Sequence, residues 1–250
     1  MLPGQRHQPK PAYDKCQAAL LKHRKRGDAQ KAVDTLNEMI GRWSPPPTAI
    51  SFNVVIDACG KAGELHLAWA LLGRMQQLQI PPNVVTFTSL ISACGRAEQL
   101  QLAFSPFDQM QRTGLAPNGA TSNALIHAHT KAGDFVGANQ AIDSMRCAGH
   151  APDAKTYTPV IHALAEAGHV DMALAGLSSM VASGVEPTLA TFDGLLRACI
   201  KQNHAVQASG HSCTPPHQYD IAWHTQVRQL MSAMHACGLQ PRANTAAEAR

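Results

Sequence analysis

The strongest constraint on this chain is a repeat of about 35 residues, marked by methionines. Six methionines recur along the chain, and successive ones are separated by 36, 35, 35, 35 and 54 residues. The series is Met39, Met75, Met110, Met145, Met180 and Met234. A proline follows each of these methionines by seven residues, and a glycine follows the last four by four residues. Self-similarity at a period of roughly 20–50 residues is typical of solenoids and other repeat arrays.

Each repeat contains two predicted helices. The first has apolar residues at i, i+3, i+4 and i+7, such as Phe52, Val55, Ile56 and Cys59, which is one stripe of an α-helix. The second has a small residue followed by larger apolar ones, such as Ala68, Leu72 and Met75. One hairpin cannot bury its stripe alone, but stacked neighbours can. The sequence therefore predicts an all-α fold, an α-solenoid of stacked antiparallel helical hairpins.

Short signals separate these helices. Gly63, Gly133 and Gly168 suit the left-handed position that ends a helix. Glu98 stands there in one repeat, so we expect that turn to be built differently. A Ser or Thr at the third position of repeats 2–6 can cap the new helix by accepting a backbone N–H bond. These residues are Ser51, Thr86, Thr121, Thr156 and Thr191.

The period divides the chain into six repeats, numbered 1–6 here. Their ranges are 13–48, 49–83, 84–118, 119–153, 154–188 and 189–242. Residues 1–12 are expected to be irregular, and 243–250 to be a tail or the start of a truncated repeat. The last repeat holds 19 extra residues near 202–220, a stretch rich in polar residues, Gly and Pro. We expect a flexible loop there, with the second helix resuming near Ala222 and keeping Val227, Met231 and Met234 in register.

The net charge of +4 is unevenly distributed. Residues 1–48 contain nine Lys/Arg and four Asp/Glu, a balance of +5, whereas the remainder sums to −1. The basic run at 22–26 suits either an anionic partner or a solvated helix face. No apolar run is long enough for a transmembrane helix. The seven cysteines include no Cys-x-x-Cys pair, which argues against a disulfide framework or a thiolate zinc site and favours a reducing compartment.

The sequence offers no catalytic constellation. Cys59, Cys94 and Cys199 recur at one stripe position and are expected to pack in the core, and His129, at the same position, is expected to be partly buried and hydrogen-bonded. Cys and His residues also gather in and around the insertion, at Cys199, His204, His211, Cys213, His217 and His224. Their spacing does not match a zinc site, so we expect a metal-free loop. We expect no enzyme activity, no cofactor and no metal.

The repeat resembles the pentatricopeptide repeat (PPR) family. Its unit has the pattern V-V-T-Y-N-x-L-I…A-G…A…M…G-x-x-P-D, and residues 84–91 are Val-Val-Thr-Phe-Thr-Ser-Leu-Ile. Ala97, Ala103, Met110, Gly114 and Pro117 continue the match. Repeats 2–5 match well, and repeat 1 has Gln17 where Asn or Thr is usual. The tetratricopeptide repeat is excluded because its period is 34 residues and its Trp-Leu-Gly-Tyr pattern is missing.

The resemblance implies single-stranded RNA as the partner, bound along the concave face with one base per repeat. In the family, the fifth and last residues of a repeat recognise the base. They are Asn53 with Asn83, Thr88 with Asn118, Asn123 with Asp153, and Thr158 with Thr188. The family's habits give pyrimidine, A and U for the first three pairs. The fourth pair does not match a usual combination, and we expect a purine there. Asp193 with Arg242 also matches no usual pair. The expected core is 5′-pyrimidine-A-U-3′.

Two further roles follow from the resemblance. The second residue stacks between bases, and Ile50 and Val85 are large enough to do so. The thirteenth residue faces phosphate, as Lys61, Arg96, Lys131 and Lys201 would, with Glu166 as the exception.

Four base-recognition pairs discriminate few bases, so the chain is either a fragment of a longer array or works with a protein partner. We expect a monomer that has no membrane partner and that acts in RNA maturation in a mitochondrion or chloroplast. The alternative is a protein-binding helical scaffold without RNA recognition.

Overall fold

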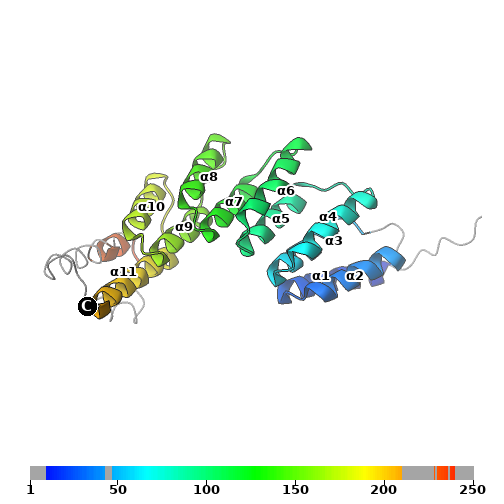
Figure 1. The fold of residues 1–250 in the computed structure, drawn as a ribbon, viewed down its shortest axis with the longest axis horizontal. Helices are drawn as coiled ribbons and strands as arrows, with labels where there is room; N and C mark the ends of the chain where they lie inside the picture. Colours follow the sequence, from blue (N-terminus) through cyan, green and yellow to red (C-terminus); the bar gives the residue numbers. More distant parts are fainter. Residues whose placement is uncertain (1–9, 43–46, 210–227, 229, 236, 240–250) are drawn as a thin grey trace, which may run out of the picture. The chain divides into compact units, whose positions relative to one another are not determined.

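The computed structural model describes residues 10–42, 47–209, 228, 230–235 and 237–239, and the regular secondary structure of these residues is all α-helical, with short connections between helices (Figure 1). Eleven helices are defined. They are α1 (Lys10–Arg26), α2 (Ala29–Arg42), α3 (Ala49–Ala62), α4 (Leu65–Gln77), α5 (Val84–Arg96), α6 (Leu100–Arg112), α7 (Gly119–Lys131), α8 (Phe135–Cys147), α9 (Ala154–Glu166), α10 (Val170–Ala182) and α11 (Leu189–Ser209). The predicted all-α hairpin solenoid is confirmed. None of these helices is long and apolar enough to span a bilayer.

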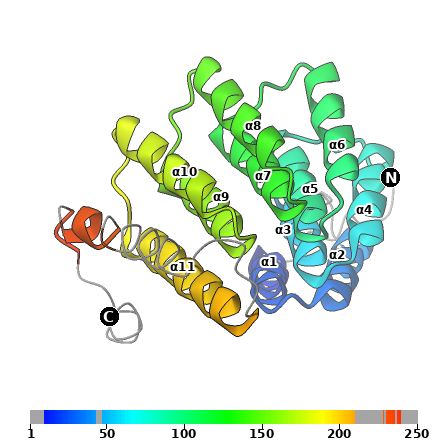
Figure 2. The same ribbon diagram turned by 60° about the vertical axis from the view of Figure 1, so that its left-hand side comes forward.

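The chain forms two compact bodies, Met1–Asp134 and Phe135–Arg250, called here the N-terminal and C-terminal bodies. In the N-terminal body the first helices of successive repeats, α1, α3, α5 and α7, pack against one another in order. The second helices α2, α4 and α6 lie outside them and pair with their own first helix. In the C-terminal body α9 packs against both α10 and α11 (Figure 2).

The core of each body comes from the predicted stripes. Phe52, Phe87 and Phe192 are fully buried, each from the fourth position of its repeat. Met39, Met75, Met110, Met145, Met180 and Met234 are buried too, so the residues that define the period are core residues. Cys59, Cys94 and Cys199 are buried as expected, and burial raises the pKa of the Cys59 and Cys199 thiols to about 11.

Helix starts combine two residues from adjacent repeats. Asn83, Asn118 and Asp153 are the N-caps of α5, α7 and α9, and each side chain accepts the backbone N–H of the residue three positions on. In return the hydroxyl of that threonine accepts the backbone N–H of the cap, as Thr86 does from Asn83 at 3.1 Å. The capping role predicted for the third-position threonines is therefore confirmed in reciprocal form.

The expectation of a different turn at Glu98 is wrong. Glu98 takes φ 57°, close to the 78° of Gly63 at the same position of repeat 2. The closing bonds also match: Gln99 N–H donates to the Cys94 carbonyl at 3.0 Å, and Glu64 N–H to that of Cys59 at 2.9 Å. The hydrogen bonds that end the helix thus outweigh the steric cost that Cβ imposes in the left-handed region.

Replacing Glu98 with Gly is expected to raise the free energy of unfolding by about 0.5–1 kcal/mol. The gain is the strain of a non-glycine residue in this region, less the larger unfolded-state entropy of glycine. Denaturant unfolding followed by circular dichroism measures it. Glu98→Ala is the control, because it removes the same charge and keeps Cβ; a gain of equal size in both variants would contradict the explanation.

Both ends of the solenoid differ from the expected boundaries. Residues 10–12 form the first turn of α1, since the fixed φ of Pro11 suits that turn and its missing N–H costs nothing there. At the other end α11 continues to Ser209, so residues 202–209 are helical and not part of a loop. The sequence has no Gly or Pro between Leu195 and Ser209, and the next breaker after Gly194 is Gly210.

The rest of the predicted insertion, 210–220, lies outside the described residues, as do Ala222 and Val227, and the same holds for His211, Cys213, His217 and His224. Residues 230–235 are helical and bury Met234, in the register expected for a second helix.

Candidate nucleic-acid interface

The predicted contact positions of a repeat lie on one face of its first helix. Positions 2, 5 and 13 are predicted contacts on this helix, and with position 9, which was not among the predicted contacts, they are separated by three, four and four residues, a spacing that aligns side chains along a helix. In α3 these are Ile50, Asn53, Asp57 and Lys61. The residues predicted to stack on a base, to recognise a base and to contact phosphate therefore follow one another along a single helix.

In repeat 2 the structure brings the predicted base-recognition pair into direct contact. Asn53 Nδ2 donates to Asn83 Oδ1 at 3.2 Å, and Asn53 Oδ1 accepts from the Thr86 hydroxyl at 2.7 Å. Asn53 is only 7% exposed, whereas Asn83 is half-buried. A base would thus meet the Asn83 side of this pair first.

Repeats 3 and 5 connect their pairs through one hydroxyl. The Oγ1 atoms of Thr88 and Thr121 lie 2.8 Å apart, and Thr121 Oγ1 donates to Asn118 Oδ1 at 3.1 Å. In the C-terminal body, Thr191 Oγ1 lies 3.0 Å from Thr158 Oγ1 and 3.1 Å from Thr188 Oγ1. Asn118 and Thr188 are exposed and the fifth residues are half-buried, which is the same asymmetry as in repeat 2.

The pair of repeat 4 is divided between the bodies. Asn123 lies half-buried on α7 of the N-terminal body. Asp153 is exposed in the C-terminal body, where it caps α9 through Thr156. Each residue occupies the position on its own helix that the repeat predicts.

Residues that the prediction left out complete the pattern. Ser51 Oγ donates to Gln17 Oε1 at 2.8 Å, so the fifth residue of repeat 1 also meets the third residue of repeat 2. In four repeats the third-position hydroxyl thus also contacts the fifth residue of the preceding repeat, at Ser51, Thr86, Thr121 and Thr191. The signal available in the sequence was the recurrence of Ser or Thr at this position.

The predicted stacking residues are exposed apolar side chains in the N-terminal body. Ile50 is 64% and Val85 56% exposed, although both are large and hydrophobic. Each precedes a base-recognition residue by three positions and so lies beside it on the helix. Single exposed apolar side chains are common on proteins, and Val136 is as exposed at 65%, so it is their place beside the fifth residue that agrees with the predicted role.

Two of the four predicted phosphate contacts converge on one carboxylate. Lys61 Nζ lies 3.3 Å from Asp57 Oδ2, and Arg96 Nη2 donates to Asp57 Oδ1 at 3.0 Å. Arg96 Nε also donates to the Gly60 carbonyl at 3.2 Å. Arg24 of α1 approaches the same carboxylate, with Nε 3.9 Å from Oδ2. The cations are therefore gathered at one place in the N-terminal body.

The other two predicted phosphate contacts are exposed. Lys131 ends α7, and its charge together with that of Arg96 adds to burial in lowering the pKa of the His127 imidazole. In the C-terminal body Lys201 and Arg197 line a cavity of about 450 Å³ between α9 and α11, which also includes Glu166. Glu166 is the acidic exception at position 13, so this end of the face has mixed charge.

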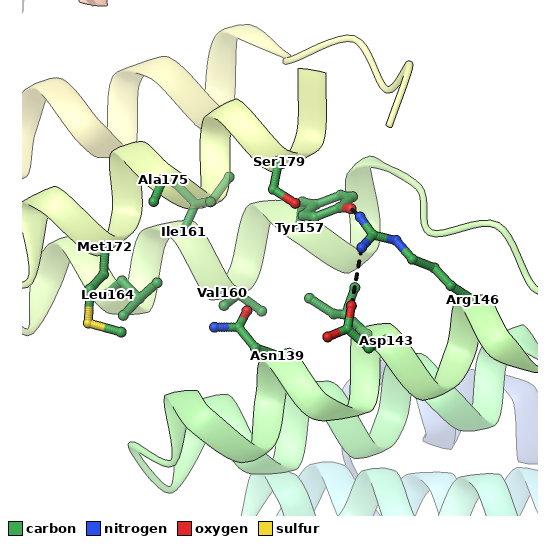
Figure 3. A pocket seen from close by; sticks show the side chains of 12 residues that line it. Asn139, Asp143, Arg146, Tyr157, Val160, Ile161, Leu164, Met172, Ala175 and Ser179 are labelled. Carbon is green, nitrogen blue, oxygen red and sulfur yellow. Dashed lines mark hydrogen bonds and ion pairs between the residues drawn. The ribbon is translucent and has the colours of Figure 1, made fainter. Parts of the chain in front are cut away.

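A second cavity, of about 290 Å³, lies between α8, α9 and α10 and contains none of the predicted contact residues. Arg146 occupies one end, where it donates to the Tyr157 and Ser183 hydroxyls and pairs with Asp143 (Figure 3). Val160, Ile161 and Leu164 form much of its apolar wall. Because the Arg146 guanidinium is already bound to these side chains, we interpret the cavity as a packing gap between helices that a polar cluster closes at one end.

The described residues contain no group of three or more His, Cys, Asp or Glu placed to hold a metal ion. The predicted partly buried His129 is confirmed: it is 9% exposed, and its Nδ1 lies 2.9 Å from Asp134 Oδ2. Together with the ring of Phe104, which meets it edge-on, this contact gives His129 a structural role.

Comparison with known proteins identifies the repeat. The model of a family described as the pentacotripeptide-repeat region of PRORP matches residues 42–208, about two thirds of the chain. No curated protein matched the sequence.

Solved structures of similar fold include the PPR domain of Arabidopsis thaliana protein-only RNase P 1 in complex with tRNA. That domain is 20% identical with a TM-score of 0.57, and the match covers 77% of this chain and 91% of that one. The pentatricopeptide repeat protein PPR10 bound to an 18-nt psaJ RNA element is 21% identical with a TM-score of 0.60, over 91% of this chain. A structure of PPR10 from maize is 24% identical with a TM-score of 0.54, over 89% of this chain and 34% of that one.

This chain spans only 34% of the PPR10 chain. At these identities the likeness establishes a shared fold, while the family model matches the sequence itself. The 35-residue period, the stacked hairpins and the matched family model agree, and the chain belongs to the pentatricopeptide repeat family, with its match in the repeat region of PRORP.

Proposed function

We propose that this protein binds single-stranded RNA sequence-selectively along the first helices of its repeats. The observation that carries the proposal is the repeated polar connection on that face. In repeats 2, 3 and 5 the fifth residue meets the last residue directly or through one hydroxyl. Donors and acceptors held in fixed positions are what recognition of a base edge requires.

The exposed apolar side chains and the cations add to this. Ile50 and Val85 lie one turn before the base-recognition residues Asn53 and Thr88, where a base could stack on them. Lys61, Arg96, Lys131 and Lys201 would contact phosphate and supply an affinity that is independent of sequence and weakened by salt. The proposed core target is 5′-pyrimidine-A-U-3′, from Asn53 with Asn83, Thr88 with Asn118 and Asn123 with Asp153.

The biological role follows from the family. We assign the protein to RNA maturation in a mitochondrion or chloroplast, as a monomer that supplies RNA binding and no catalysis. The solved relatives support RNA as the ligand, since PPR10 was determined with an RNA element and the PPR domain of protein-only RNase P 1 with tRNA.

A second candidate ligand is structured RNA. The matched family model describes the repeat region of PRORP, and the related PPR domain was solved with tRNA. A protein of this kind would bind shape and phosphate and would depend little on the fifth and last residues. A protein-binding scaffold, the third candidate, would bind neither RNA.

A selection from a random single-stranded RNA pool tests the first proposal, with a tRNA pool run in parallel. Enrichment of pyrimidine-A-U is the expected result, since each recognised base contributes about 1–3 kcal/mol. Retention of tRNA alone would favour the second candidate. No retention of either RNA at low salt would contradict RNA binding, and the protein-binding scaffold would be the remaining candidate function.

A further inference from the structure

We infer that Asp57 is a built-in competitor of RNA phosphate, which holds Lys61 and Arg96 in ion pairs and weakens backbone binding at repeat 2. The inference rests on the proposed RNA-binding function and adds a residue that opposes it. It starts from the position of Asp57 on α3, one turn after Asn53 and one turn before Lys61. At this spacing the carboxylate lies on the same helix face as both residues.

The contacts show that this carboxylate is the centre of a cluster formed by Asp57, Arg24, Lys61 and Arg96. Three cations from three helices, α1, α3 and α5, lie within 3.9 Å of its oxygens. Arg96 reaches across from the next repeat and is fixed by two bonds, to Asp57 Oδ1 and to the Gly60 carbonyl. All four side chains keep between 24% and 40% of their surface exposed, so a ligand can reach them.

The ninth position differs between repeats. Repeats 2–6 have Asp57, Ser92, His127, His162 and Arg197 there, so among these five only repeat 2 has an acid. The acid also belongs to the repeat whose base-recognition residue, Asn53, is the most deeply buried of the fifth residues proposed to contact RNA. The N-terminal part of the face thus has one internal anion among three cations, which lowers the charge of this cluster from +3 to +2.

Phosphate and carboxylate compete for the same donors. Arg and Lys bind both through charge-assisted hydrogen bonds, and an exposed ion pair in water is weak enough to exchange. To contact RNA here, Lys61 and Arg96 must leave Asp57, and the carboxylate then repels the incoming phosphate. Asp57 therefore lowers affinity and also lowers the number of counterions that binding releases.

Asp57→Asn tests the inference by fluorescence anisotropy with a short single-stranded RNA that contains pyrimidine-A-U, between about 50 and 200 mM salt. We expect Kd to fall about 3- to 10-fold at the lower salt, and the slope of log K against log salt to steepen by about 0.7–1.4, as one or two more phosphates are contacted. Thermal unfolding of each variant checks that it is folded.

Two matched variants sharpen the test. Glu38→Gln removes the same charge on α2, where Glu38 pairs with Arg42, and is expected to change the slope little because α2 is a second helix. Ser92→Asp introduces the acid at the ninth position of repeat 3, beside Arg96, and is expected to weaken binding about 3- to 10-fold with a flatter slope.

The outcomes separate the inference from the proposed function. Binding by the unaltered protein with the same Kd and slope in Asp57→Asn would overturn the inference alone, as would an equal gain in Glu38→Gln, which would show a general charge effect. Absence of RNA binding in the unaltered protein and in Asp57→Asn alike would overturn the proposed function and the inference together.

Discussion

Replacing Thr88 with Asn is expected to move the base preference at the second recognised position from A to a pyrimidine, chiefly C. Discrimination between the two bases should change by about 1–3 kcal/mol, or roughly 5- to 150-fold in relative affinity. Binding affinities for RNAs that differ only at this base measure the change. Preferences at the neighbouring bases should stay as they are, because the other pairs keep their own side chains.

The structural reason is that repeat 2 already has the arrangement that the substitution would create in repeat 3. Asn53 accepts from the Thr86 hydroxyl and donates to Asn83, whereas Thr88 meets the Thr121 hydroxyl, which donates to Asn118. Repeats 2 and 3 share the threonine at the third position of the following repeat and the terminal asparagine. A side-chain amide at position 88 would add a donor and an acceptor to a setting that now has one hydroxyl.

Thr88→Ser is the control, because it keeps the hydroxyl within reach of Thr121 and should keep the preference for A. Thr113→Asn is a second control, with the same chemical change at the exposed end of α6. An unchanged preference in Thr88→Asn would remove Thr88 from base recognition. A change in Thr113→Asn of the same size would show that the substitution acts through something other than the proposed face.

Much of the fold could be predicted because a period and a stripe are local features of a sequence. Met75, Met110 and Met180 were predicted to lie in second helices, and they lie in α4, α6 and α10. Glu98 and residues 202–209 could not be predicted in the same way. At Glu98 the hydrogen bonds of the turn outweigh the residue's own preference, and at 202–209 composition suggested a loop although no Gly or Pro lies between Leu195 and Ser209.

The positions of the candidate site followed from the repeat, but its connections did not. The contacts between Gln17 and Ser51 and between Thr88 and Thr121 join residues 34 and 33 apart. They depend on how closely the first helices stack, which the sequence specifies only through the small residues between them. The cluster around Asp57 could not be predicted from the sequence for the same reason, since its cations come from three repeats.

Repeat 4 shows how composition at the stripe affects packing. Its fourth residue is Ser122, where repeats 2, 3, 5 and 6 have Phe or Tyr, and much of its core is small, with Ala124, Ala128 and Ala138. The border between the two compact bodies falls inside this repeat, after Asp134. Ser122 buries less apolar area than Phe or Tyr would, and less buried area means less stabilisation of this repeat, at about 25 cal/mol per Å².

Close packing of the first helices predicts a second large effect. A Cβ atom on Gly60 of α3 would lie 2.6 Å from the Ala93 Cβ and 3.0 Å from the Ala93 Cα of α5, and 2.8 Å from Arg96 Nη2. The guanidinium can move aside, but the Cα and Cβ of Ala93 can give way only if α5 shifts. Gly60→Ala is therefore expected to lower the free energy of unfolding by about 1–3 kcal/mol, the usual cost of overpacking a core.

Gly73→Ala is the matched control, since Gly73 lies inside α4 with no atom within 4 Å of a new Cβ. There the same substitution should stabilise the protein by about 0.5–1 kcal/mol, because alanine loses less backbone entropy in a helix. Denaturant unfolding of both variants should thus give shifts of opposite sign. Stabilisation by Gly60→Ala as large as that by Gly73→Ala would mean that α3 and α5 are not held at this spacing, and the contacts of Arg96 with Gly60 and Asp57 would then lose the close approach on which they depend.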